Sequence, residues 1–259
     1  IINQFFVSQL FHKIYYTEDI AERAEGMKQQ LSILLDLFLV LRQKYAILDP
    51  MLFSVDTVEQ FGGKSRANGF NIVKNSLFYS CVMDVYKIAK DKDRRTSSVI
   101  NFMKELANEE LVNYLREEYA KTAFHPIVSL GPEEVDFSYY QEIRYKENID
   151  AFNEMCERLL KDWQNFSKSS QMSSFKTARN KLIAHIEVIE SESGLYITDI
   201  SKLGLKWGDL KSTILKLQDI MELLNCIVRN ASFAWQYYDE QLEKISSDYW
   251  SSFGSKNDR

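Results

Sequence analysis

One short stretch of the chain, residues 179–185, combines residue types that could cleave a phosphodiester bond without a metal. Arg179 and His185 are six residues apart on a predicted helix, so their directions around the helix axis differ by roughly 120°. The long side chain of Arg179 can span that difference, and Asn180 can orient either partner. We therefore expect Arg179, Asn180 and His185 to line one cleft as catalytic residues.

RNA is the substrate that suits these side chains, because RNA supplies its own nucleophile, the 2′-hydroxyl group. Its cleavage needs a group that takes or gives a proton near neutral pH, and the unperturbed pKa of histidine lies in that range. It also needs a fixed cation beside the pentavalent phosphate, where negative charge accumulates, and arginine supplies that cation through paired donors. The scheme requires no metal and no cofactor.

A structural role is the alternative for the same two residues. Arg179 can pair with an acid, and a cationic His185 near a helix C-terminus is favoured by the helix dipole. The spacing of an arginine and a histidine arises readily by chance. The identities of Asn180 and Ala184 and the helical setting make the pattern more specific.

Any contact with RNA must use a local basic patch, because the chain as a whole has a net charge of −5. The stretch between Trp163 and Ile186 contains no Asp or Glu, and its cations are Lys168, Lys176, Arg179 and Lys181. This local excess of positive charge predicts an RNA path that uses the three lysines. A solvated helix face is the alternative.

A second basic cluster precedes the first, at Lys87, Lys90, Lys92, Arg94 and Arg95. Two interspersed aspartates, at 91 and 93, weaken its positive charge. Asp84 interrupts an apolar helical pattern, so it orients the catalytic Arg or His, forms a structural pair, or points to solvent.

The sequence lacks the residue patterns that other classes of catalytic site require. His12 and His125 have no ligand-spaced partners and no HExxH motif is present, so we expect no bound metal. Residues 61–65 match only the end of a phosphate-binding loop, without its first glycine or a preceding strand, and no GxSxG motif occurs.

The three cysteines contain no CxxC pair and two of them fall in apolar helical patterns, which predicts a reduced, cytoplasmic protein. Residues 1–16 lack the basic region of a signal peptide. The apolar stretch 31–41 is interrupted by Asp36 and is too short to span a membrane, so no membrane association is expected.

The elements that must position the site are helices, because nine glycines and three prolines are too few for a turn-rich β fold. Apolar residues at steps of three and four predict an all-α bundle of about five to seven helices. The expected helices cover about 18–48, 70–90, 97–107, 109–121 and 138–167, then a segment capped by Ser173 or Ser174 that runs through His185, then 209–243. Between them we expect an irregular region at 49–69, a loop at 122–137, and a mixed region at 188–208 with a short extended piece at 195–197.

These helices make up one domain, residues 1–245, with an N-terminal arm at 1–17 and a loosely ordered tail at 246–259. The apolar stripes are best read as its core. The alternative is a seam between two chains, because heptad stepping also suits helix pairing, and the aromatic group Trp235, Tyr237 and Tyr238 could add apolar contact there.

The stretch 179–185 resembles the motif of the HEPN superfamily (higher eukaryotes and prokaryotes nucleotide-binding), an Arg followed four to six residues later by His, typically with Asn after the Arg. Residues 76–84, the basic turn at 94–95 and residues 97–99 also resemble the abortive-infection U-type branch of that superfamily.

The resemblance implies a helical homodimer that cleaves RNA, with Arg179 and His185 at a cleft shared by the two chains. It also implies a role in phage defence or in a toxin–antitoxin system, with an antitoxin or another defence protein as partner. Some members have a tyrosine two residues after the His that receives AMP; here that residue is Glu187, so this regulation is not expected. The alternative reading is a non-catalytic HEPN-like module that binds a protein or a nucleotide.

Overall fold

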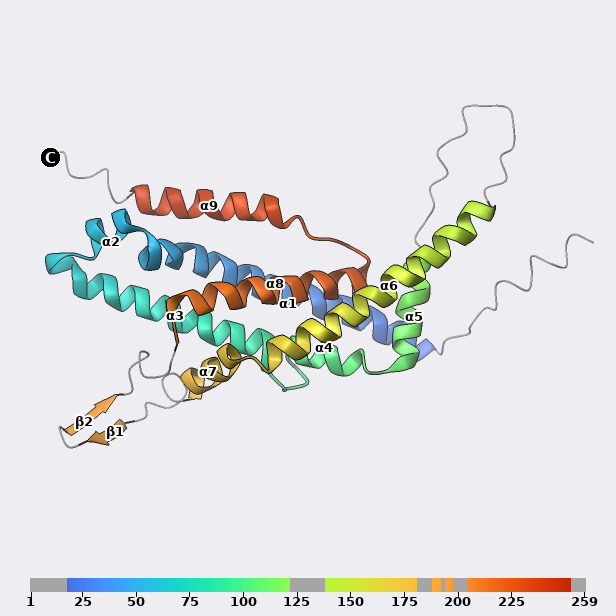
Figure 1. The fold of residues 1–259 in the computed structure, drawn as a ribbon, viewed down its shortest axis with the longest axis horizontal. Coiled ribbons are helices and arrows are strands. Elements are labelled where there is room, and N and C mark those ends of the chain that lie inside the picture. Colours follow the sequence, from blue (N-terminus) through green and yellow to red (C-terminus); the bar gives the residue numbers. More distant parts are fainter. Residues whose placement is uncertain (1–17, 122–137, 181–187, 192–193, 198–204, 253–259) are drawn as a thin grey trace, which may run out of the picture.

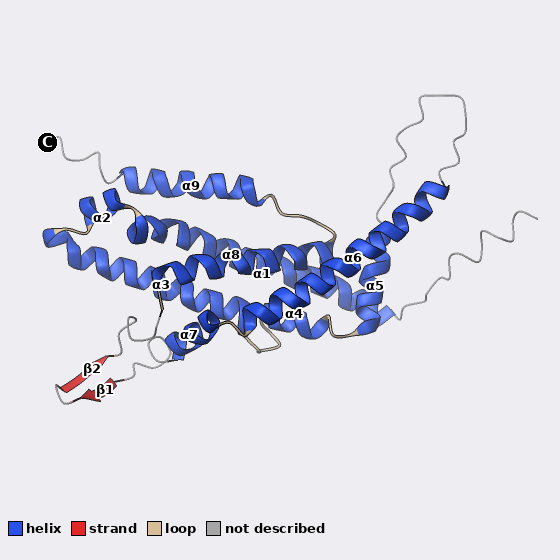
Figure 2. Ribbon diagram, viewed as in Figure 1, coloured by secondary structure: helices blue, strands red, loops and turns tan. Residues whose placement is uncertain are grey.

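The computed structural model describes residues 18–121, 138–180, 188–191, 194–197 and 205–252, and this part of the chain is an elongated bundle of helices (Figures 1 and 2). Its elements are α1 (Glu18–Phe53), α2 (Val55–Phe61), a 3-10 turn η1 (Lys64–Arg66), α3 (Ala67–Lys90), α4 (Val99–Glu105), α5 (Glu109–Ala120), α6 (Ser138–Ser167), α7 (Ser170–Ala178), β1 (Val188–Ser191), β2 (Gly194–Ile197), α8 (Trp207–Arg229) and α9 (Trp235–Ser252). The all-α fold class is confirmed. The described part has nine α-helices, more than the five to seven expected, because short helices form where we expected irregular chain and one expected helix is two.

The first helix, α1, is the centre of the fold, and α2, α3, α5, α8 and α9 all pack against it. Its predicted apolar stripe is buried along its whole length: Ile20, Ala24, Met27, Leu31, Leu34, Phe38, Leu41, Tyr45 and Leu48. Within one chain, these residues are therefore the core that the pattern predicts.

We expected the first helix to end before Asp49–Pro50, but α1 continues through Pro50 to Phe53. A proline inside a helix has no N–H for the carbonyl four residues earlier, which here belongs to Ala46. The hydroxyl of Ser246 on α9 donates to that carbonyl at 2.7 Å and replaces the missing donor. Met51, just after the proline, is only 2% exposed, so burial also favours continuing the helix.

The chain from 209 to 243 was expected to be one helix but forms two, α8 and α9. Asn230 ends α8 with φ 49°, a left-handed conformation that reverses the chain direction. Glu222 then fixes the connection: its carboxylate accepts hydrogen bonds from Ser232 Oγ at 2.7 Å, the Phe233 backbone N–H at 3.2 Å and Trp235 Nε1 at 2.7 Å. The chain therefore turns back, and α9 packs along α1.

Other boundaries follow from their caps. The helix α6 has the predicted bounds, but α7 begins at Ser170, because the side chain of Ser169, not of Ser173 or Ser174, caps it by accepting from the Met172 N–H at 3.2 Å. The region 49–69 is helical rather than irregular, and the Ser54 side chain caps α2.

Residues 195–197 are extended, as predicted, and belong to strand β2. This strand pairs antiparallel with β1, with Val188 opposite Ile197 and Ser191 opposite Gly194. The expected tail is helical from 246 to 252, within α9, and residues 253–259 lie outside the described residues. Among the described helices, none is long and apolar enough to cross a membrane.

Candidate functional site

The candidate site begins where α7 ends. Phe175 and Ala178 are almost fully buried and anchor α7, which packs on α3. Beyond Ala178, Arg179 keeps helical backbone angles, and its backbone N–H donates to the carbonyls of Phe175 and Lys176.

Arg179 is half-buried, and its guanidinium lies over the ring of Tyr86 on α3, 5.0 Å from the ring centre. Its Nη1 donates to the Oδ1 of the exposed Asn180 at 3.3 Å. The structure therefore brings together two of the three predicted catalytic residues. His185 and Lys181 lie outside the described residues.

The other two lysines of the predicted RNA path, Lys168 and Lys176, are both exposed. Lys176 is in the last turn of α7, and Lys168 lies in the short connection between α6 and α7. Both side chains are therefore accessible to a ligand, but they lie at opposite ends of α7.

The second basic cluster divides into two parts. Arg95 is used locally, because its guanidinium pairs with Asp93 at 2.7 Å and its backbone N–H donates to the same carboxylate. Lys90, at the end of α3, instead lies over the ring of Trp163 on α6, 4.8 Å from the ring centre. Partial burial, and secondarily the charge of Lys92, lower the pKa of Lys90.

Asp84 does not pair with Arg179. Its Oδ2 lies 2.6 Å from the Nζ of Lys44 on α1, and the same ammonium donates to Ser80 Oγ at 3.0 Å. Asp84 therefore makes the structural pair that was one of the three sequence hypotheses, and it ties α3 to α1.

The thiols of the chain are poor candidates for nucleophiles. Cys81 is fully buried, and burial, followed by the nearby charge of Asp84, raises its pKa to about 12. Burial also raises the pKa values of Cys156 and Cys226 to about 11. At neutral pH all three are therefore protonated.

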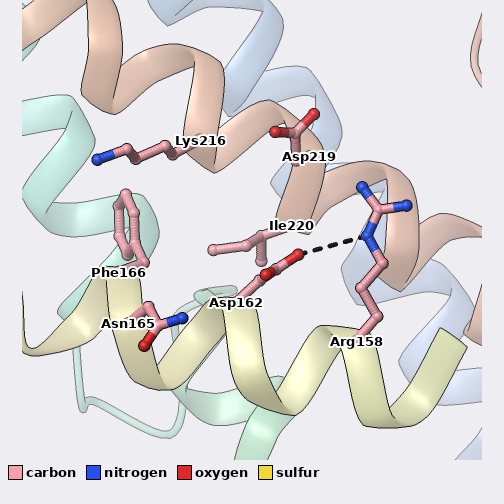
Figure 3. A pocket seen from close by; sticks show the side chains of 7 residues that line it. All are labelled: Arg158, Asp162, Asn165, Phe166, Lys216, Asp219 and Ile220. Carbon is pink, nitrogen blue, oxygen red and sulfur yellow. Dashed lines mark ion pairs between the residues drawn. The ribbon is translucent and has the colours of Figure 1, made fainter. Parts of the chain in front are cut away.

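A groove of about 410 Å³ lies between α6 and α8 (Figure 3), and its lining residues are Arg158, Asp162, Asn165, Phe166, Lys216, Asp219 and Ile220. Arg158 pairs with Asp162 at 3.5 Å. The two cations and two carboxylates of the lining cancel in formal charge, which makes the groove a poor site for a phosphate group. Within the residues that the structure describes, no cluster of His, Cys, Asp and Glu is suited to a metal ion.

Sequence reasoning missed Tyr86 and the contact of Lys90 with Trp163. The signal was present in part, because Tyr86 and Lys90 are four residues apart and so share one face of α3. Which rings the two cations contact depends on how α6 and α7 pack, and no local pattern encodes that.

A comparison with protein-family models finds one that covers most of the chain. The model, described as AbiU2 (HEPN_AbiU2), matches residues 17–249, from the start of α1 to near the end of α9. Comparisons with curated proteins and with solved structures gave no match.

Proposed function

The chain belongs to the HEPN AbiU2 family, and from that membership and the setting of Arg179 we propose that it is a metal-independent endoribonuclease. The proposed reaction is attack of the RNA 2′-hydroxyl on the adjacent phosphate, with Arg179, Asn180 and His185 in the site. The proposed biological role is phage defence or toxicity within a toxin–antitoxin system, with an antitoxin or another defence protein as partner.

The observation that supports this most strongly is the way Arg179 is held. Within the described residues its guanidinium forms no ion pair with a carboxylate, whereas Arg23 and Arg42 each pair with an acid. The contact with Tyr86 is made with an aromatic ring rather than with an acceptor oxygen, so it leaves most of the guanidinium N–H groups available for a ligand. Those donors can form two parallel hydrogen bonds to one phosphate group.

Each side chain has a separate role in the proposed reaction. Arg179 stabilises the negative charge that develops on the phosphate oxygens, and Asn180, which already accepts from Arg179, keeps that guanidinium oriented. His185 transfers the proton.

One histidine cannot easily remove a proton from the 2′-oxygen and give one to the leaving oxygen at the same time. We therefore include a homodimer in the proposal, in which two chains contribute two Arg179–His185 pairs to one cleft. A two-fold arrangement is also the commonest way in which identical chains associate.

The decisive experiment measures cleavage of a mixed RNA pool by the parent protein and by Arg179→Ala and His185→Ala. Both variants should lose cleavage, by about 100-fold or more, because each removes a charge-stabilising or proton-transferring group. Arg229→Ala, which removes an exposed arginine at the end of α8, is the matched control and should cleave like the parent. Parent-like cleavage by both site variants would show that the site is elsewhere.

The chemistry has its own test. Cleavage should persist in EDTA and should leave a 2′,3′-cyclic phosphate or its 3′-phosphate product. RNA with a 2′-O-methyl group at the cut position should resist, because it lacks the nucleophile. Normal cutting of that RNA would eliminate the mechanism, and RNA that binds without being cut by the parent would favour the non-catalytic alternative.

The shared cleft is tested by dilution. Activity per chain should fall as monomer becomes populated, and light scattering should report a dimer at concentrations that give full activity. A monomer with full activity would refute the shared cleft and leave Arg179 and His185 as a pair within one chain.

A further inference from the structure

Two cation–ring contacts each involve a residue of α3, and these two residues are one helical turn apart. The guanidinium of Arg179 lies over Tyr86, a residue of α3, at 5.0 Å, and Lys90, also on α3, lies over Trp163 of α6 at 4.8 Å. Four residues of helix separate Tyr86 from Lys90, a rise of about 6 Å. The two cation–ring contacts therefore both involve the C-terminal part of α3.

Both cations lack an acidic partner within the described residues, whereas Lys44, Lys121 and Lys146 all form ion pairs. The nearest carboxylates in sequence to Lys90 are occupied within their own turn. Asp91 accepts from the backbone N–H of Asp93 at 3.1 Å, and Asp93 accepts from Arg95 at 2.7 Å.

Lys90 is also partly withdrawn from water, and its ring partner is firmly held. Trp163 is only 8% exposed and stacks on Phe166 with ring centres 6.0 Å apart. A partly buried ammonium with no counter-ion gains more from a bound anion than a fully solvated one, because less water must be displaced and less screening opposes the attraction. The same partial burial is the main cause of the lowered pKa of Lys90.

We propose that Lys90 binds a second phosphate of the RNA backbone, besides the one held by Arg179, so that the RNA strand runs along the C-terminal half of α3. This proposal rests on the proposed function, since it takes RNA as the substrate. Lys90 is then a binding residue rather than a catalytic one. Trp163 fixes the position of its ammonium, as Tyr86 does for the guanidinium of Arg179.

The alternative role of Lys90 is to stabilise the packing of α3 on α6 through its contact with Trp163, without a ligand. Lys90→Met separates the two roles. Methionine keeps an unbranched apolar chain that can cover the indole, and it removes the charge. Lys90→Arg keeps the charge and the ring contact and should behave like the parent.

The experiment uses full-length protein with His185→Ala in every variant, so that RNA is not consumed, and a short single-stranded RNA as probe. Anisotropy gives the binding constant over a range of salt concentrations. For single strands the slope of log K against log salt becomes shallower by about 0.7 for each phosphate that the protein no longer neutralises. We expect that change for Lys90→Met, together with weaker binding at low salt and unchanged urea unfolding.

The matched control is Lys244→Met, which removes an exposed lysine from α9, at the opposite edge of the molecule from α7 in Figure 1. Its slope should equal that of the parent. An unchanged slope for Lys90→Met, or an equal change for Lys244→Met, would overturn the proposed contact.

The two proposals can fail separately. If RNA binds with a slope that depends on Lys90 but the protein with intact His185 does not cut it, the nuclease is refuted and the Lys90 contact stands. If that protein cuts RNA while Lys90→Met leaves the slope unchanged, only the Lys90 contact is refuted.

Discussion

Removing the charge of Asp84 tests whether this residue stabilises the fold or serves the site. Asp84→Asn keeps the shape of the side chain and abolishes its ion pair with Lys44, whose Nζ lies 2.6 Å from Oδ2. If the pair only ties α1 to α3, the variant should lose stability and keep its RNA cleavage. If Asp84 orients the catalytic groups, cleavage should fall by more than the stability change explains.

The magnitude follows from the burial of the pair. The side chains of Lys44 and Asp84 are 34% and 22% exposed, so the pair is partly buried. A surface ion pair contributes about 0–1 kcal/mol to stability, and breaking a fully buried pair costs about 3–5 kcal/mol. The hydrogen bond from Lys44 to Ser80 Oγ does not involve Asp84, so we expect it to remain when Asp84 is replaced. We therefore expect a coupling free energy of about 1–2 kcal/mol between Lys44 and Asp84.

A double-mutant cycle measures this coupling. The free energy of unfolding in urea is compared for the parent, Asp84→Asn, Lys44→Met and the double variant. The exposed pair Lys146–Glu142 on α6, with side chains 71% and 50% exposed, is the control and should couple by less than about 0.5 kcal/mol. Equal coupling in the two pairs would refute the argument from burial, and a loss of cleavage of about 100-fold in a stable Asp84→Asn protein would assign Asp84 to the site.

Three further predictions concern other parts of the molecule. Glu222→Ala should destabilise the fold by about 2–4 kcal/mol in urea unfolding, because it leaves the Trp235 Nε1–H and a backbone N–H without an acceptor; a change under about 0.5 kcal/mol would contradict this. Tyr86→Leu should reduce RNA cleavage by about 2- to 30-fold, because a cation–ring contact contributes about 0.5–2 kcal/mol, whereas Tyr86→Phe should cleave like the parent; equal rates for the two would show that the ring does not position Arg179. In the folded state burial raises the pKa of the Cys81 thiol to about 12, above its ordinary value of 9.0. The unfolded state therefore releases this proton at a lower pH than the folded state does. The free energy of unfolding should fall as the pH rises from about 9 toward 12. When the pH is raised from about 9 to about 11, the free energy of unfolding should fall less for Cys81→Ala than for the parent. An identical pH dependence in the two proteins would argue against the thiol as the cause.

The long helices could be predicted from the sequence because their stabilising pattern is local. The apolar stripe of α1 and the bounds of α6 need only residues three and four apart. The errors arose where distant residues change the local preference. Pro50 remains inside a helix because Ser246, almost 200 residues later, satisfies the freed carbonyl, and the break at Asn230 depends on the contacts of Glu222 with the next segment.

The candidate site was predictable only in its residue types. The motif identified Arg179 and Asn180 together, and the structure places their side chains in contact. The ring partners of Arg179 and Lys90 were not predictable, because Tyr86 belongs to α3, more than 90 residues before Arg179, and Trp163 belongs to α6. Such contacts depend on tertiary packing rather than on spacing along one helix.

The dependence of α1 on α9 has a consequence for the order of events during synthesis. The helix α1 leaves the ribosome well before α9, because the serine that satisfies its interrupted hydrogen-bond ladder follows Ala46 by 200 residues. At translation rates of about 5–20 residues per second, that delay is about 10–40 seconds. During this interval the buried stripe of α1 lacks α8 and α9, and the nascent chain exposes apolar surface that chaperones recognise. A ribosome that stalls before Ser246 therefore leaves an aggregation-prone fragment in which the helix interrupted by Pro50 lacks this support.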